Sequence, residues 1–205
     1  MLCERSLLAM ARGDWGPAET FADQARTTVR QAGIEELLVY AAQARVAWHR
    51  GDVAAVRREL VSAQRLRPLV TYAYPHMAVQ ARIELVRVHL ALADTAGART
   101  LIREVDEVLE RRPDLGTLVS EVQALRERLA RDRGPSVPGA SSLTTAELRV
   151  LPMLATHLSF PEIGAEMFLS PHTVKSQAMS IYRKLGVSSR NQAVTRSREL
   201  GLLDS

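Results

Sequence analysis

The sequence contains little cysteine and few histidines, and neither residue is arranged for metal binding. Cys3 is the single cysteine, which excludes an internal disulfide, and the five histidines lack the spacing of metal ligands. There is no GxxxxGK[ST] phosphate-binding loop and no nucleophile placed beside a base. No apolar run has the length of a membrane span, and no signal-peptide pattern opens the chain. We therefore expect a cytoplasmic protein that is not an enzyme and needs no metal or cofactor.

Aromatic residues are also scarce, at 4% of the chain, whereas 46% of the residues are hydrophobic. That hydrophobic share is ample for a core within 205 residues, a length typical of one or two domains. Alanine, leucine, arginine and glutamate dominate, and these residues favour helix over sheet. The composition therefore predicts an all-α fold.

A stretch rich in glycine, proline and serine, residues 134–141, supports neither helix nor strand. It separates a larger part, residues 1–133, from a smaller part, residues 142–205. We interpret residues 134–141 as the linker between two domains.

The larger part contains three weakly similar copies of one pattern. The first, LLAMARGDWGPAETFADQA, resembles VAWHRGDVAAVRRELVSAQ, with Gly13 matching Gly51 at an offset of 38. The third, VHLALADTAGARTLIREVD, places Ala98 opposite Ala55 at an offset of 43. Each copy has a helix, a tight turn, a small residue (Ala18 in the first copy) and a second helix. A period slightly above 34 predicts tetratricopeptide-like helical hairpins.

The predicted helices of this part cover residues 2–12, 16–31, 34–50, 52–66, 75–93, 95–111 and 115–132. Stacked hairpins would bury one continuous core. Its expected members are Leu37, Leu38, Ala41, Ala44, Val46, Ile83, Val86 and Leu90. A run of arginines, Arg57, Arg58, Arg65 and Arg67, is compatible with anion binding, but Glu59 interrupts it and favours a solvated face.

Within the smaller part, residues 142–203 have start and stop signals for four helices. The start signals are Thr144 with Glu147, Ser159 with Glu162, Ser170 with Pro171, and Ser189 with Gln192. Gly186 and Gly201 are the stop signals of the last two helices. Pro152 lies inside the first helix, where a missing N–H and a ring clash predict a kink or an early end.

The third of these helices, residues 171–185, has one apolar and one polar face. Its apolar stripe, at steps of four, three and four, consists of Val174, Ala178, Ile181 and Leu185. The opposite face carries His172, Ser176, Met179 and Arg183, with Lys175 on the flank. Such a helix suits the major groove of DNA. The net charge of +4 is too small to indicate nucleic-acid binding by itself, but the two lysines, Lys175 and Lys184, both fall on this helix.

The segments LTTAELRVLPMLA, EIGAEMFLS, TVKSQ, IYRKLGV, SSR and RELGLL, in this order, resemble the LuxR-type helix-turn-helix domain of bacterial transcription regulators. The resemblance implies a sequence-specific transcriptional regulator that binds double-stranded DNA as a homodimer. It places Lys175, Ser176 and Met179 at base edges, with apolar readout by Met179. The residues that it places at phosphates are Thr173, Gln177, Lys184 and Arg190. The residues that it places at a dimer contact of the fourth helix are Ala193, Val194 and Ser197.

The larger part resembles the helical repeats that precede this domain in large activators of the MalT kind. That resemblance implies that the repeats take up an inducer or a protein partner. In such activators an ATP-binding domain lies further upstream, so we expect this chain to be the C-terminal piece of a longer regulator or a shortened relative. An alternative function is a protein-interaction adaptor whose C-terminal domain does not bind DNA.

Overall fold

The computed structural model describes residues 1–28, 33, 35–132 and 139–204. All the secondary-structure elements assigned within these residues are helices, which confirms the predicted all-α fold. The first part holds α1 (Leu2–Arg12), α2 (Trp15–Thr28), α3 (Glu36–His49), α4 (Val53–Leu66), the 3₁₀ turn η1 (Arg67–Leu69), α5 (Pro75–Ala91), α6 (Thr95–Arg111) and α7 (Thr117–Arg131). The predicted helices agree with these bounds to within two residues, except that residues 29–31 and 34 lie outside the described residues.

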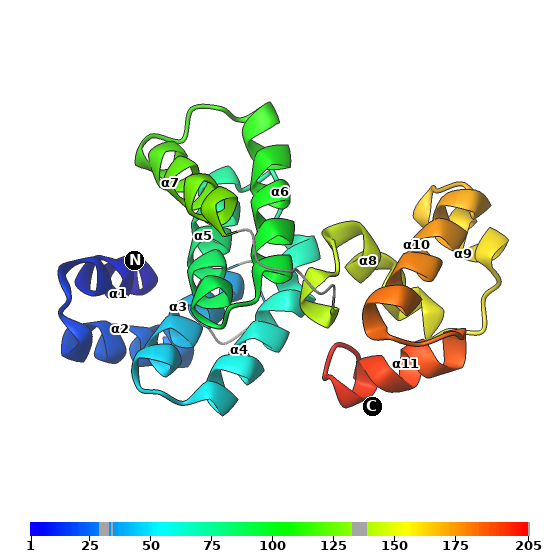
Figure 1. Cartoon of the computed structure of the whole chain (residues 1–205), viewed down its shortest axis with the longest axis horizontal. Coiled ribbons are helices and arrows are strands. Elements are labelled where there is room, and N and C mark those ends of the chain that lie inside the picture. Colours follow the sequence, from blue (N-terminus) through cyan, green and yellow to red (C-terminus); the bar gives the residue numbers. More distant parts are fainter. Residues whose placement is uncertain (29–32, 34, 133–138, 205) are drawn as a thin grey trace.

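The three predicted hairpins pair α1 with α2, α3 with α4, and α5 with α6 (Figure 1). Each hairpin turns through a residue in the left-handed region: Gly13 at φ 81°, Gly51 at φ 76° and Ala93 at φ 57°. The amide of the aspartate that follows always donates to the carbonyl oxygen five residues earlier. Glycine suits this conformation because it has no Cβ, whereas Ala93 adopts it at a cost of about 1–2 kcal/mol. The sequence pattern thus located three equivalent turns.

In the second hairpin, the buried residue after the turn is Val56 and not the predicted Ala55. The residues four places after the turn aspartates are Ala18, Val56 and Ala98, and all three are 0% exposed. Ala55 is only half-buried. The predicted core residues are buried or, for Leu90, partly buried, but Ala44 and Val46 belong to clusters separate from the main one. The described core of the repeats is therefore divided rather than continuous.

The C-terminal domain contains η2 (Ala140–Ser142), α8 (Thr145–Leu154), α9 (Phe160–Met167), α10 (Pro171–Leu185) and α11 (Arg190–Glu199). Capping boxes form at Thr144 and Ser159, and Ser170 and Ser189 each accept a backbone N–H at the start of a helix, as predicted. The η2 turn corrects the prediction of a linker without helix up to residue 141. The linker residues 134–138 lie outside the described residues.

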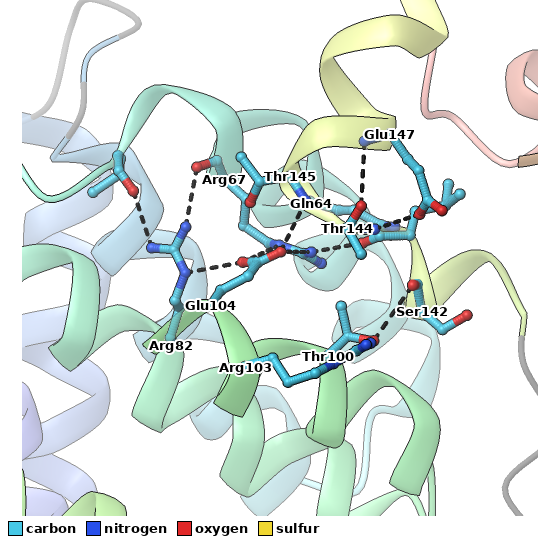
Figure 2. A network of polar contacts seen from close by, with 12 residues as sticks. Gln64, Arg67, Arg82, Thr100, Arg103, Glu104, Ser142, Thr144, Thr145 and Glu147 are labelled. Carbon is cyan, nitrogen blue, oxygen red and sulfur yellow. Dashed lines mark hydrogen bonds and ion pairs between the residues drawn. The ribbon is translucent and has the colours of Figure 1, made fainter. Parts of the chain in front are cut away.

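A buried carboxylate joins the two domains (Figure 2). Glu104 of α6 accepts hydrogen bonds from Arg67 at 2.5 and 3.2 Å and from Arg82 at 3.0 Å. It also accepts the backbone N–H of Thr145 in the first turn of α8 at 3.0 Å, while Arg67 donates to the carbonyl oxygen of Leu143 at 2.6 Å. Burial raises the pKa of Glu104, but the charges of the two arginines outweigh it, and the net pKa lies below its ordinary value. We call this cluster the Glu104 clamp.

Further contacts extend the junction on either side of the clamp. Gln64 of α4 donates to the carbonyl oxygen of Ala140 at 2.5 Å. At the end of the chain, Arg65 pairs with Asp204 at 2.6 Å. The run of arginines seen in the sequence is therefore divided, because Arg67 is buried in the clamp and Arg65 pairs with the C-terminal segment.

We predict that Glu104→Gln lowers the free energy of unfolding by about 3 kcal/mol, because it removes the anion from two buried guanidinium groups. The matched control is Glu19→Gln, which breaks an ion pair with Arg50, itself 48% exposed; the loss there should stay below about 1 kcal/mol. Urea unfolding of both variants measures the difference. Equal losses would show that the clamp does not stabilise the fold.

Candidate nucleic-acid interface

The apolar stripe of α10 holds this helix against the rest of its domain. Val174, Ala178 and Ile181 are 0% exposed and belong to the C-terminal core, to which α8 and α9 also contribute. Ser170 accepts the N–H of Thr173 at 3.0 Å at the start of the helix, and Gly186 ends it in the left-handed conformation. The stripe predicted from the sequence is therefore the buried face.

The opposite face of α10 is open to solvent. The exposed residues are His172, Lys175, Ser176, Met179 and Arg183, and the relative solvent exposure of Met179 is 47%. Thr173 and Gln177 are half-buried. Figure 1 shows α8 between the helical repeats and α10, so the repeats do not cover this helix. A protruding helix with one free polar face has the shape that a major groove admits.

The turn between α9 and α10 depends on a glycine that the sequence analysis did not single out. A Cβ on Gly164 would lie 2.6 Å from the carbonyl oxygen of Leu169, so only glycine fits there. The amide of Leu169 donates to the carbonyl oxygen of Gly164 at 2.8 Å, and Phe168 adopts φ 55° between the helices. The sequence shows a glycine inside a helix here, but its partner appears only once the turn has formed.

Lys184 lies inside the domain rather than on the open face of α10. Its Nζ donates to Glu147 at 2.6 Å and to the carbonyl oxygen of Ser142 at 2.8 Å, and its side chain is 11% exposed. Burial raises the pKa of Glu147, but its hydrogen bonds with Lys184 and Thr144 help to bring the net pKa below the ordinary value. Lys184 thus ties the end of α10 to the start of α8, and its predicted phosphate contact stays a prediction.

Arg190 is also engaged within the domain. Its guanidinium donates, at 2.6–3.1 Å, to the carbonyl oxygens of Met153, Leu154, Thr156 and Leu158. These carbonyl groups lie at or just after the end of α8, which ends at Leu154, two residues after Pro152, and the last carbonyls of a helix have no donor within the helix. A guanidinium has five N–H donors, and four of these contacts leave little for a phosphate. The predicted phosphate contact of Arg190 would compete with these internal bonds, and it stays a prediction.

The fourth helix, α11, is turned inward at two of the three predicted dimer residues. Ala193 and Ser197 are 0% exposed, so neither side chain reaches a second chain, whereas Val194 is half-buried. The amide of Leu202 donates to the carbonyl oxygen of Ser197 at 2.8 Å, which folds the C-terminal segment back onto the helix. At the start of α11, the Gln192 amide donates to the Ser189 hydroxyl, as a capping box requires. The side chain of Gln192, however, accepts from the amide of Ser188 and not from that of Ser189.

The described residues contain no cluster of three or more histidine, cysteine, aspartate or glutamate side chains suited to a metal ion. Within the same part of the chain, no helix combines the length and apolarity needed to cross a membrane. The open face of α10 carries two cations, Lys175 and Arg183, and neither forms an ion pair with another described residue. A polar, cationic and uncovered helix face can make hydrogen bonds and ionic contacts to DNA.

A comparison with known protein families matches residues 141–197 to the GerE domain, described as "Bacterial regulatory proteins, luxR family". Residues of this chain are 33% identical over 139 positions to the transcriptional regulatory protein YdfI of Bacillus subtilis, covering 66% of this chain and 61% of YdfI. The probable transcriptional regulatory protein NarL of Mycobacterium tuberculosis is 40% identical over 72 residues, which are 35% of this chain and 33% of NarL.

The spore germination protein GerE of Bacillus subtilis is 36% identical over 62 residues, which are 30% of this chain and 84% of GerE. The chain therefore covers most of GerE but less than two thirds of YdfI and NarL. No solved structure matches the chain. The helix-turn-helix geometry and the match to most of GerE agree: this chain belongs to the luxR family of bacterial regulatory proteins.

Proposed function

We propose that this transcriptional regulator binds a specific DNA sequence by placing α10 in the major groove. The observation that carries the proposal is the division of α10 into a fully buried apolar stripe and an uncovered polar face. Lys175, Ser176 and Met179 would meet base edges, where Lys175 donates and Met179 contacts a thymine methyl group. The neighbouring residues His172, Thr173, Gln177 and Arg183 would contact the sugar-phosphate backbone.

Lys184 and Arg190 have supporting roles in this proposal. Lys184 fixes the end of the recognition helix, and Arg190 closes the end of α8. Because the open face of α10 carries only two cations, this helix of a single copy can make few ionic contacts to phosphates, so we infer that a homodimer binds a palindromic or repeated site. Because Ala193 and Ser197 are buried, the dimer contact would use other residues of the chain.

We also infer that the helical repeats receive the signal, either an inducer or a protein partner. The Glu104 clamp supports this inference, since it joins α6 of the repeats directly to the first turn of α8. A change of packing among the repeats that moves α6 would therefore also move the start of α8 in the DNA-binding domain.

The direct test is selection of bound sequences from random double-stranded DNA, followed by titration at several salt concentrations. The proposal expects an enriched motif and binding that weakens as salt rises. Equal binding to every sequence would remove the specificity. No binding at physiological salt would favour the adaptor alternative.

We predict that Lys175→Ala weakens binding to the selected site by about 1–3 kcal/mol and relaxes base preference at one position. The free energy of unfolding should not change, because Lys175 is exposed and has no ion-pair partner among the described residues. A gel-shift titration against the selected site and a mismatched site measures both effects. Unchanged discrimination would take Lys175 out of the base-reading set.

The other lysine provides a matched comparison. We predict that Lys184→Ala lowers the free energy of unfolding by about 1–3 kcal/mol, because it leaves the buried carboxylate of Glu147 short of a donor. Urea unfolding of Lys184→Ala and Lys175→Ala separates the two roles. A Lys184→Ala variant with wild-type stability and weaker DNA binding would restore the phosphate contact predicted from the sequence.

A further inference from the structure

A cavity of about 880 Å³ lies where the helical repeats meet the C-terminal domain. Residues of α4 and of the end of α5 form one wall, and residues 140–141 and 199–202 form the other. The volume is within the range of small-molecule sites, about 300–1,000 Å³. The two walls approach closely, because a Cβ on Gly201 would lie 3.2 Å from Cγ1 of Val61. The cavity therefore exists only in the docked arrangement of the two domains.

Aliphatic side chains from both domains line the cavity. Leu60 and Leu92 come from the repeats, while Leu200 and Leu202 come from the C-terminal segment. Leu60, Leu92 and Leu200 are only partly buried, so they retain apolar surface that a ligand can cover. Covering such surface is favourable by about 25 cal/mol per Å². This lining selects a ligand with an alkyl or aryl body.

The charged residues that line the cavity are two arginines, Arg57 and Arg58, and two carboxylates, Asp94 and Glu199, and only the carboxylates already have partners. Arg57 and Arg58 are exposed, and neither has a hydrogen bond or ion pair with another described residue. The acidic side chains are already paired: Asp94 contacts His89 at 2.9 Å, and Glu199 accepts from Arg196 at 2.9 Å. Two unpaired guanidinium groups beside an apolar surface suit a carboxylate, sulfonate or phosphate.

His89 and Asp94 form a polar part of the cavity wall and contact each other. A Cβ on Gly97 would lie 2.8 Å from both Nδ1 of His89 and Oδ2 of Asp94, so a glycine is needed for this pair to form. Burial raises the pKa of Asp94, but its hydrogen bonds to His89, to the Gly97 amide and to Ser141 outweigh burial and bring the pKa to about 2. Asp94 therefore stays occupied by its own partners, and the arginines remain the groups that face a ligand.

We propose that this interdomain cavity binds a small amphipathic anion. Its apolar body lies against the leucines of both domains, and its anionic group pairs with Arg57 and Arg58. In the function proposed above, this anion would be the signal that the regulator receives, and that role rests on the proposed function. Binding itself is measured without DNA, so a failure of the cavity and a failure of DNA recognition are separate results.

The test uses the full chain and two probes of opposite charge. The fluorescent anion 8-anilinonaphthalene-1-sulfonate is titrated first and is then displaced by decanoate or by decyltrimethylammonium, each below its micelle-forming concentration. We expect saturable binding of the dye and displacement by decanoate but not by the cation. Absence of saturable binding, or equal displacement by both probes, would overturn the proposal.

Two variants locate the site. Arg57→Ala with Arg58→Ala should weaken decanoate at least tenfold, and Ser62→Trp, which places a large side chain in the cavity, should do the same without changing charge. The matched control removes another adjacent exposed pair, Arg111→Ala with Arg112→Ala, and should bind like the wild type. Equal losses in the control and in the double variant would overturn the proposal, as would full binding by Ser62→Trp.

Discussion

The arrangement of the two domains depends on the desolvated carboxylate of Glu104. An isolated buried carboxylate is strongly unfavourable, so it must find donors. Glu104 takes them from Arg67 and Arg82 of the repeats and from the amide of Thr145 at the start of α8. A helix N-terminus carries partial positive charge, which makes α8 a suitable third partner. The need to pair this charge thus fixes the DNA-binding domain on the repeats.

The same chain of contacts continues to α10, the proposed recognition helix. Thr144 donates its amide to Glu147 at 2.7 Å, and Glu147 accepts from Lys184 at the end of α10. Three carboxylate-centred contacts therefore connect α6, α8 and α10 without passing through a loop tip. Charge pairs of this kind need good geometry to offset desolvation, so they hold a defined orientation of α10 relative to the repeats. The interdomain cavity has walls from both domains, so a ligand of the proposed kind would bias that orientation.

Local signals in the sequence predicted local structure well, because helix caps and tight turns are decided by neighbouring residues. The N-caps at Thr144 and Ser170 and the turns at Gly13 and Gly51 are examples. The roles of Lys184 and Arg190 could not be read in this way. Their partners lie 32 to 42 residues away in the sequence, at or near the ends of other helices. The sequence pattern of a helix does not distinguish a cation that faces solvent from one that faces a carboxylate.

The internal use of cations limits how this protein can bind DNA. Each phosphate contact contributes through counterion release, with a salt slope of about 0.9 per phosphate neutralised. Lys184 and Arg190 are held by groups of the domain, and the open face of α10 retains Lys175 and Arg183. In the proposed function, α10 of one copy would therefore supply base-reading residues but few ionic contacts to phosphates. In the proposed function a second copy on the same DNA supplies the missing affinity, and since Ala193 and Ser197 are buried, the proposed contact between copies would use a surface other than the inner face of α11.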